Sequence, residues 1–247
     1  RLTERCFRLL SEEKLRRAEK DGEKTVSGTL GVKDGVLAFT FPDFAVTAEE
    51  EKKQAADPRA AEEVKSELNE IVGLSEVKDY VLSLEQNYII QRLREARGMK
   101  ADVPTMHMIF TGNPGTGKTT IARILAKYLK AIGALRGGQL VEVTRADLVG
   151  RYVGHTAPLT NSVIQSALGG VLFIDEAYSL YRGEQDSFGL EAIDTLVKGM
   201  EDHRDELVVI LAGYTGEMET FLTANSGLAS RFPNKVEFPD YTADELL

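Results

Sequence analysis

Cysteine is nearly absent from this sequence: Cys6 is the single cysteine among 247 residues, and there is no tryptophan. One thiol cannot form a disulfide within the chain and is too few for a cysteine-based zinc cluster. Apolar runs are short, and none approaches the about 20 residues of a membrane-spanning helix. The opening stretch RLTERCFRLLSEEKLRRAEK lacks the apolar core of a signal peptide. We therefore expect a cytoplasmic protein with no membrane partner.

Positive charge is also in short supply, with 30 Lys and Arg against 39 Asp and Glu and a formal net charge of −9. A protein that binds nucleic acid usually has a basic face, so this balance argues against a nucleic-acid partner. Hydrophobic residues make up 43% and charged residues 28% of the chain, which is typical of a globular protein.

The N-terminal quarter of the chain differs in composition from the rest. Residues 1–24 have the pattern of a charged amphipathic helix. The tripeptide KDG at 33–35 predicts a hairpin turn between two short strands. Residues 48–66 are rich in Glu, Lys and Ala and predict a polar linker. We therefore expect a small α+β element over residues 1–64 and a second domain over residues 65–247.

Short apolar runs alternate with helical patterns in the second domain. The expected strands are 106–110, 140–143, 170–175, 207–213 and 236–238. Strands that alternate with helices usually form a parallel sheet covered on both faces. The sequence therefore predicts an α/β fold with a five-stranded parallel sheet between helices.

A glycine-rich stretch, GNPGTGKT, follows the first of these strands and fits the P-loop pattern G-x-x-x-x-G-K-[ST]. Its backbone N–H groups and the start of the next helix can surround a phosphate. Lys118 can neutralise the β- and γ-phosphates, and the Thr119 hydroxyl can bind Mg²⁺. A glycine-rich turn that binds nothing is the alternative. We expect the nucleotide to be bound by Asn113, Pro114, Gly115, Thr116, Gly117, Lys118, Thr119 and Thr120.

Two carboxylates end another apolar strand, in the stretch GVLFIDE. Asp175 can hold the Mg²⁺ shell, and Glu176 can orient and deprotonate a water that attacks the γ-phosphate. Two solvated carboxylates at a strand end are the alternative. Because a hydrolase needs such a base, the pair and the P-loop together predict an ATP hydrolase with ATP and Mg²⁺ as cofactors.

At this point the sequence resembles the AAA+ ATPases and, within them, the CbxX/CfxQ-like family that includes the red-type Rubisco activase and stage V sporulation protein K. The resemblance covers about residues 66–247. It is present in IVGLSEVKDYV, MIFTGNPGTGKTTIAR, ADLVGRYVGHTAPLT, GGVLFIDEAYSL, EAIDTLVKGMED, VVILAGYTGEM and GLASRFPNKVEFPDY.

The resemblance implies further roles around the nucleotide. Val72 and Gly73 would pack on the adenine. Thr215 would be the sensor that contacts the γ-phosphate or the water, although Tyr214 is adjacent. Arg231 would be the arginine finger that reaches the nucleotide of a neighbouring subunit, which implies a ring, expected to be a hexamer. The alternative for Arg231 is an ordinary surface arginine.

The stretch Tyr152-Val153-Gly154 resembles the pore loop with which AAA+ translocases grip a client polypeptide. A flat aromatic side chain can contact an extended peptide without reading its sequence. The alternative is an aromatic side chain buried beneath the loop.

Together these features imply a ring-forming, Mg²⁺- and ATP-dependent remodeller of a client protein, similar to stage V sporulation protein K. Red-type Rubisco activation is one alternative. A nucleotide-gated assembly scaffold with little turnover is another, and the acidic charge argues against a DNA-dependent motor. The stretch TADE at 242–245 predicts a capping box that opens a helix. We expect the chain to continue into a helical lid, and the lid-less chain to bind nucleotide weakly and to hydrolyse it slowly or not at all.

Overall fold

The computed structural model describes residues 29–33, 36–40, 56–97, 105–224 and 226–245. The chain divides into two compact units, Arg1–Lys53 and Gln54–Leu247. In the first unit, β1 (Thr29–Lys33) and β2 (Val36–Thr40) pair antiparallel, with Lys33 opposite Val36. The two strands therefore pair as expected. The expected helix over 1–24 and the turn residues Asp34 and Gly35 lie outside the described residues.

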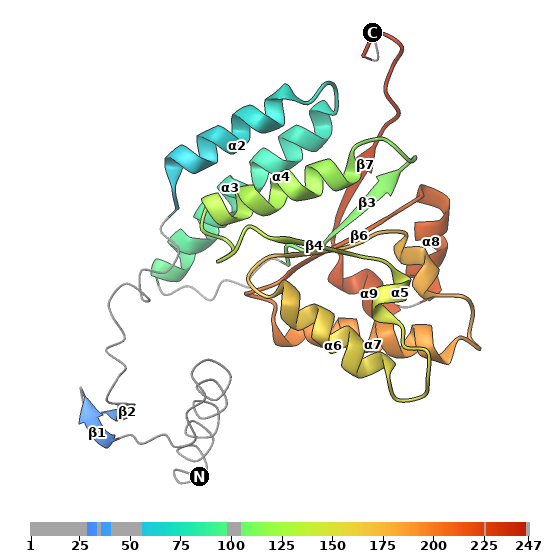
Figure 1. Cartoon of the computed structure of the whole chain (residues 1–247). Helices are drawn as coiled ribbons and strands as arrows, with labels where there is room; N and C mark the ends of the chain where they lie inside the picture. Colours follow the sequence, from blue (N-terminus) through green and yellow to red (C-terminus); the bar gives the residue numbers. More distant parts are fainter. Residues whose placement is uncertain (1–28, 34–35, 41–55, 98–104, 225, 246–247) are drawn as a thin grey trace. The chain divides into compact units, whose positions relative to one another are not determined.

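The second unit is built on a parallel sheet (Figure 1). Its strands are β3 (Met108–Gly112), β4 (Leu140–Val143), β5 (Val171–Ile174), β6 (Val208–Gly213) and β7 (Asn234–Phe238). Their order in the sheet is β4-β5-β6-β3-β7, and every neighbouring pair is parallel. The expected five-stranded parallel sheet is thus confirmed. Strand β6 separates β3, which precedes the glycine loop, from β5, which precedes the two carboxylates.

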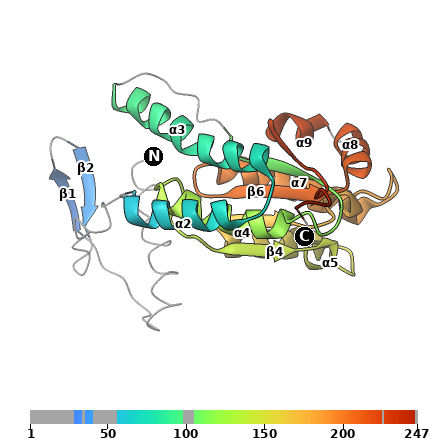
Figure 2. The same cartoon turned by 90° about the horizontal axis from the view of Figure 1, so that it is seen from above.

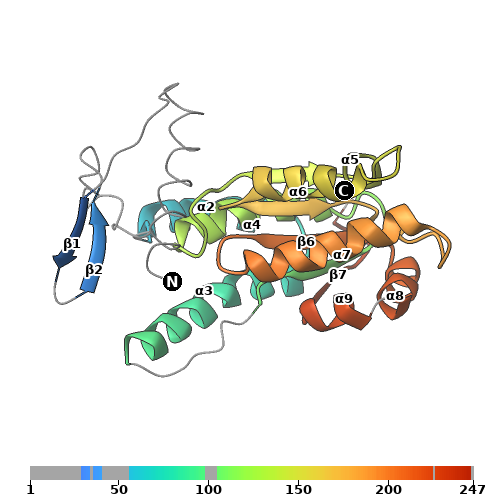
Figure 3. The same cartoon turned by 90° about the horizontal axis from the view of Figure 1, so that it is seen from below.

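Helices cover both faces of this sheet. They are α2 (Pro58–Glu70), α3 (Ser75–Ala96), α4 (Lys118–Ala131), α5 (Arg145–Leu148), α6 (Thr156–Ala167), the 3-10 helix η1 (Ala177–Leu180), α7 (Ser187–Asp202), α8 (Thr215–Ala224) and α9 (Ser226–Arg231). Helices α2, α3 and α4 lie on one face, as seen from above in Figure 2. Helices α6 and α7 lie on the other, as seen from below in Figure 3. No helix in the described part of the chain has the length and apolar character needed to cross a membrane.

Alternation along the strands divides the apolar side chains between two cores. In β3, Phe110 packs in the core under α4, whereas Ile109 packs in the core under α7. In β5, Phe173 packs in the core under α4, and Ile174 packs in the core under α7. Successive strand residues point to opposite faces, so a strand covered on both faces must be apolar throughout. This requirement explains why the central strands are continuous apolar runs in the sequence.

Helix α2 belongs to the sheet-containing unit. The Asp57 side chain caps it by accepting hydrogen bonds from the backbone N–H groups of Arg59 (3.0 Å) and Ala60 (3.3 Å). Pro58 is favourable in the first turn, where an N–H group would have no partner within the helix. The helix packs against α4 through Ala61, Val64 and Leu68. The expected linker over 48–66 thus overlaps a packed helix, and the boundary expected at residue 64 falls within α2.

His107, immediately before β3, is a buried polar residue of the sheet. Its Nδ1 atom accepts a hydrogen bond of 3.0 Å from the backbone N–H of Val209 in β6. Burial lowers the pKa of His107 to about 4. Protonation of Nδ1 would remove the acceptor, so the folded protein holds the imidazole neutral. His107 is therefore a core residue whose hydrogen-bonding capacity at Nδ1 is satisfied.

We expect His107 to make the fold less stable in acid. Its pKa is lower in the folded than in the unfolded chain, so its contribution is fully present above pH 6.5 and is lost as the pH falls towards 4. The loss amounts to about 3 kcal/mol. In His107→Gln the unfolding free energy from urea denaturation should vary less over this interval. The matched control is His155→Gln, at an exposed position. If the unfolding free energy of His107→Gln changed with pH as steeply as that of the wild type, this account would be contradicted.

Candidate functional site

A cleft of about 390 Å³ opens where the segments following β3, β5 and β6 meet. In an open parallel sheet, the carboxyl ends of the strands are the usual place for a ligand site. The cleft is lined by Pro114, Gly115, Gly117, Lys118, Thr119, Thr120, Asp175, Glu176, Tyr178, Gly213 and Tyr214. The fold therefore brings the predicted phosphate loop and the predicted carboxylate pair to one cavity.

The backbone of the loop depends on glycine at its two ends. Gly112 has φ 147°, and a Cβ atom there would overlap the carbonyl oxygen of Phe238 in β7. Gly117 has φ 91° and occupies the cap position of α4. No side chain at this position can accept from the first N–H groups of the helix. These donors and the partial positive charge of the helix start remain available for an anion.

Lys118 is the first residue of α4, and its side chain folds back over the loop. Its Nζ atom donates to the carbonyl oxygens of Gly112 (2.8 Å) and Asn113 (2.7 Å). Burial lowers the pKa of Lys118, while the Asp175 carboxylate acts in the opposite direction. The ammonium group is thus held inside the cleft by neutral oxygens, for which the oxygens of a phosphate would be stronger partners.

Asp175 and Glu176 both line the cleft because the chain turns sharply between them. The Asp175 N–H donates to the Val143 carbonyl (2.9 Å), and the Asp175 Oδ1 atom accepts from the Glu176 N–H (2.9 Å). Glu176 has φ 47° and ψ 45°, a left-handed conformation. Such a conformation in a residue other than glycine costs about 1–3 kcal/mol and is concentrated at functional sites. The alternation of side chains between the two faces of the sheet ends at this turn, so two adjacent carboxylates can line one cavity.

The cleft lining includes two tyrosines that the sequence did not lead us to predict as site residues. Tyr178 follows the carboxylate pair, and Tyr214 follows β6. Their rings stack with centroids 5.7 Å apart and an interplanar angle of 30°. Thr215, the predicted sensor, is exposed and begins α8. Among the described residues, the cleft lining includes Tyr214 and not Thr215. The feature of the sequence that could have identified these tyrosines is an aromatic residue after the end of each of two strands.

The described lining of the cleft does not include four of the residues predicted to bind nucleotide. Val72 is exposed, and Gly73 forms part of a turn with φ 66°. The Asn113 amide donates to both carboxylate oxygens of Asp240, each at 2.9 Å. Thr116 is buried, and its hydroxyl donates to the Asn113 carbonyl (2.8 Å). In this structure the polar side chains of Asn113 and Thr116 therefore stabilise the loop conformation.

The segments before α3 and after β7 both reach the glycine loop. A Cβ atom on Gly117 would lie 3.4 Å from the Tyr241 hydroxyl and 3.7 Å from the Leu74 Cδ1 atom. Beyond Tyr241, the N–H and hydroxyl groups of Thr242 both donate to the Glu245 carboxylate, each at 2.8 Å. These bonds lower the pKa of Glu245. This is one half of the predicted capping box, and residues 243–245 form a turn.

Arg231 lies at the end of α9 and binds within its own chain. Its Nη2 and Nε atoms donate to the Glu201 Oε2 atom at 2.6 Å and 3.2 Å. Its Nη1 atom donates to the Gly227 carbonyl at 3.0 Å. Within the described residues, Arg231 does not line the cleft.

The segment predicted to contact a client projects into solvent. Tyr152 is 68% and Val153 88% exposed, which excludes the alternative of a buried aromatic side chain. The exposed stretch covers residues 151–155, and Gly154 within it has φ 80°. The base of the segment is fixed, because the buried Thr160 hydroxyl donates to the Leu148 carbonyl at 2.9 Å. The structure therefore presents an aromatic and an aliphatic side chain on an anchored loop.

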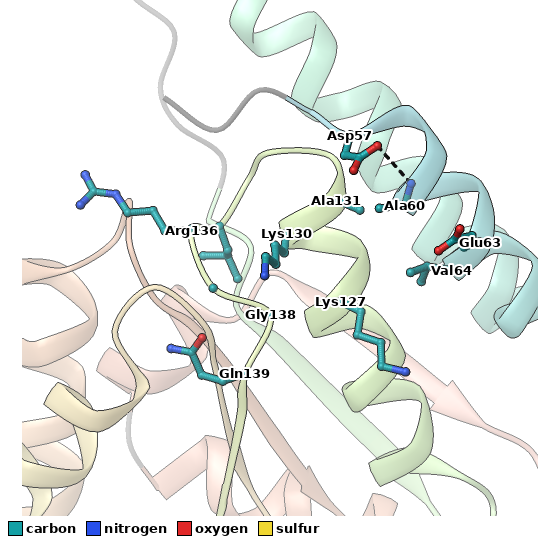
Figure 4. Close-up of a pocket in the computed structure, with 12 residues that line it drawn as sticks. Asp57, Ala60, Glu63, Val64, Lys127, Lys130, Ala131, Arg136, Gly138 and Gln139 are labelled. Atoms are coloured by element: carbon teal, nitrogen blue, oxygen red, sulfur yellow. Dashed lines mark hydrogen bonds between the residues drawn. The ribbon is translucent and has the colours of Figure 1, made fainter. Parts of the chain in front are cut away.

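A larger cleft, of about 730 Å³, lies between the start of α2, the end of α4 and the segment before β4 (Figure 4). Basic and acidic side chains line it together, among them Lys130 and Glu63. Lys127, also in its wall, already pairs with Glu67 at 2.7 Å. None of the residues predicted to bind nucleotide or metal lines this cleft, so its size alone does not make it the functional site.

The sheet order and the glycine loop beside a strand-end carboxylate pair define the class of P-loop proteins with an AAA-type fold. The family described as "ATPase family associated with various cellular activities (AAA)" matches residues 108–240. The chain belongs to this family and, within it, to the CbxX/CfxQ-like branch. Members of the family are ATPases.

Three relatives illustrate the match. Protein CbxX (plasmid) of Cupriavidus necator is 53% identical over 178 residues, 72% of this chain and 56% of that protein. The chloroplastic ribulose bisphosphate carboxylase/oxygenase activase of Cyanidioschyzon merolae is 51% identical over 179 residues, 72% and 61% of the two chains. Stage V sporulation protein K of Bacillus subtilis is 47% identical over 196 residues, 79% and 61%. The chain thus matches a little over half the length of these relatives.

The fold has a counterpart among solved structures. The AAA domain of FIGL-1, crystallised in complex with ADP, aligns with a TM-score of 0.50 at 20% identity. The alignment covers 71% of this chain and 56% of that one. At this identity the likeness supports the fold.

We expect Glu176→Gly to stabilise the protein. Glycine adopts φ 47° without the steric cost of a Cβ atom, so the free energy of unfolding should rise by about 1 kcal/mol in chemical denaturation. The matched control is Glu184→Gly, at an exposed turn position with ordinary backbone geometry. That change should lower stability by about 0.5–1 kcal/mol. If both variants lose stability equally, Glu176 is not strained.

Proposed function

We propose that the chain is the ATP-hydrolysing part of a protein remodeller that works as a ring of identical subunits. The main observation in support is the single cleft lined by Lys118, Thr119, Asp175 and Glu176. A phosphate loop alone is compatible with binding, transfer or hydrolysis. An acidic side chain beside the loop adds a candidate general base for attack by water.

In this proposal the glycine loop and the start of α4 bind the phosphates through backbone N–H groups. Lys118 exchanges its carbonyl partners for the β- and γ-phosphate oxygens. Thr119 and Asp175 would hold Mg²⁺, which neutralises charge on the phosphates when it is bound. Glu176 orients a water and accepts its proton as the water attacks the γ-phosphorus, while the bond from this phosphorus to the β–γ bridging oxygen breaks and ADP leaves.

We propose that Arg231 completes the active site of the neighbouring subunit. In the single chain it pairs with Glu201, whose side chain is 61% exposed. Such an exposed ion pair contributes about 0–1 kcal/mol, so a triphosphate on a neighbour can outcompete it. The pair keeps the guanidinium group at the surface, where a second copy can reach it. A hexameric ring is the assembly that we propose.

The client is proposed to be a polypeptide that contacts Tyr152 and Val153, which are the two most exposed of the large hydrophobic side chains described. The match to stage V sporulation protein K extends over 79% of this chain, against 72% for the chloroplastic activase. On this basis we propose a cytoplasmic role of the sporulation-protein type, and activation of Rubisco is the alternative.

Turnover should depend on assembly and on Arg231. If the site is shared, ATP hydrolysis per subunit of a version that includes the expected helical lid should rise with protein concentration. Arg231→Ala should lower kcat by about 10³-fold or more while each subunit still binds nucleotide, because an arginine finger acts on the transition state. Arg204→Ala, at an exposed arginine, is the matched control. Turnover that is independent of concentration and of Arg231 would instead favour a nucleotide-gated scaffold.

Tyr152 should be needed for work on the client and not for nucleotide binding. With a permanently unfolded polypeptide as probe, Tyr152→Ala should abolish stimulation of ATP hydrolysis and unfolding of a tagged substrate. Tyr152→Phe should retain both, since it keeps the flat ring. Basal nucleotide affinity should be the same in all three proteins. Full client processing by Tyr152→Ala would contradict the assignment of this loop.

A further inference from the structure

Arg145 is a largely buried charged residue that has no part in the proposed mechanism. It is the first residue of α5, directly after the cap of that helix at Thr144. Its side chain is 17% exposed and forms an ion pair of 2.8 Å with Asp186, which is 13% exposed. Removing two charges from water is costly unless further hydrogen bonds satisfy them. The remaining partners of Arg145 therefore indicate what this residue stabilises.

The guanidinium group of Arg145 binds the turn that follows Glu176. Its Nη1 atom donates to the carbonyl oxygens of Ser179 (2.9 Å) and Leu180 (3.0 Å), both in η1. Glu176 occupies the cap position of η1 in the left-handed conformation described above. A strained conformation persists only where its surroundings hold it. The two bonds from Arg145 therefore contribute to holding the turn that places the Glu176 carboxylate at the cleft.

The same guanidinium group is anchored to the start of α7. Its Nη2 atom donates to the Asp186 Oδ1 atom (3.0 Å), which also accepts from the Gly189 N–H in the first turn of α7 (3.1 Å). A Cβ atom on Gly189 would overlap the Leu180 carbonyl oxygen and lie 2.9 Å from the Arg145 Nη1 atom, so these contacts require glycine. Arginine suits this position because its planar fork presents several donors in a fixed geometry.

Helix α5 also leads directly into the client loop, which we define as residues 151–155. The Gly150 N–H donates to the buried Thr156 hydroxyl at 3.1 Å and so joins the two ends of the loop. A Cβ atom on Gly150 would lie 2.7 Å from the His155 Cβ atom, so the chain is closely packed there. A force on Tyr152 therefore reaches α5, and with it Arg145, through a segment that has little room to absorb the movement.

We propose that Arg145 couples the client loop to ATP hydrolysis by holding the turn that positions Glu176. The inference rests on the proposed function, because it requires both the general base and the client loop. Coupling needs an element with two arrangements. The strained turn is such an element, since release of its carbonyl groups allows Glu176 to relax. Arg145 is a positioning residue, and within the described part of the chain it does not line the cleft.

The test measures ATP turnover of a version that includes the expected helical lid, with and without a permanently unfolded, carboxymethylated polypeptide. Arg145→Met keeps an unbranched side chain and removes every donor. This variant should bind ATP and the polypeptide with wild-type Kd values, but the polypeptide should no longer raise its kcat. The matched control is Arg136→Met, which removes an exposed arginine paired with Glu206 at 3.6 Å. The polypeptide should raise the kcat of this control as it does that of the wild type.

Two further variants separate this role from a purely structural one. Arg145→Met leaves the Asp186 carboxylate without its arginine partner and should lower the stability to urea. Asp186→Asn keeps both bonds from Arg145 to η1 and should keep the stimulation by the polypeptide. The double variant has no unpaired carboxylate and should recover stability, while stimulation stays lost because η1 still has no donor. If stimulation returned together with stability, Arg145 would be only structural and the inference would be wrong.

The proposed function has its own readout in the same experiment. If the wild type neither binds nor hydrolyses ATP, the proposed function fails and the inference fails with it. If the polypeptide raises the kcat of the wild type and of Arg145→Met equally, only the inference fails. A wild type that hydrolyses ATP without responding to the polypeptide would also overturn the inference, because the client loop would then have no effect for Arg145 to transmit.

Discussion

Burial of the parallel sheet on both faces is the constraint on which the rest of the structure depends. Because helices cover each face, the central strands must be apolar throughout and cannot present polar groups along their length. Polar chemistry is therefore confined to the strand ends. All strands run in the same direction, so the segments that follow β3, β5 and β6 converge at one edge. The phosphate loop, the carboxylates and the tyrosine pair come together as a consequence of this burial.

The site also contains backbone conformations that residues other than glycine rarely adopt. Gly112 and Gly117 occupy regions open mainly to glycine, and Glu176 is one of two described residues other than glycine with positive φ. The second is Leu74, in the turn that approaches Gly117. Strained backbone persists only where surrounding packing holds it. The two packed cores beneath the strand ends provide that support, so part of the stability of the sheet maintains the geometry of the cleft.

The sequence was sufficient to predict the sheet, the glycine loop and the carboxylate pair, because each depends on neighbouring residues. It did not predict contacts that depend on a single residue of register or on distant partners. Tyr214 and Thr215 are adjacent, and only the end of β6 decides which one faces the cleft. The pairing of Arg231 with Glu201 joins α9 to α7 and has no local signature. The composition of residues 58–66 suits a linker and an exposed helix equally well, and contact with α4 decides for the helix.

The bond between Asn113 and Asp240 gives the glycine loop a second property. Asp240 follows the edge strand β7, so the loop is tied to a segment more than 100 residues later in the chain. Leu74 and Tyr241 approach the same loop from opposite ends of this unit. Segments from both ends of this unit thus lie close to the loop. A displacement of its backbone would therefore change its contacts with both of these segments.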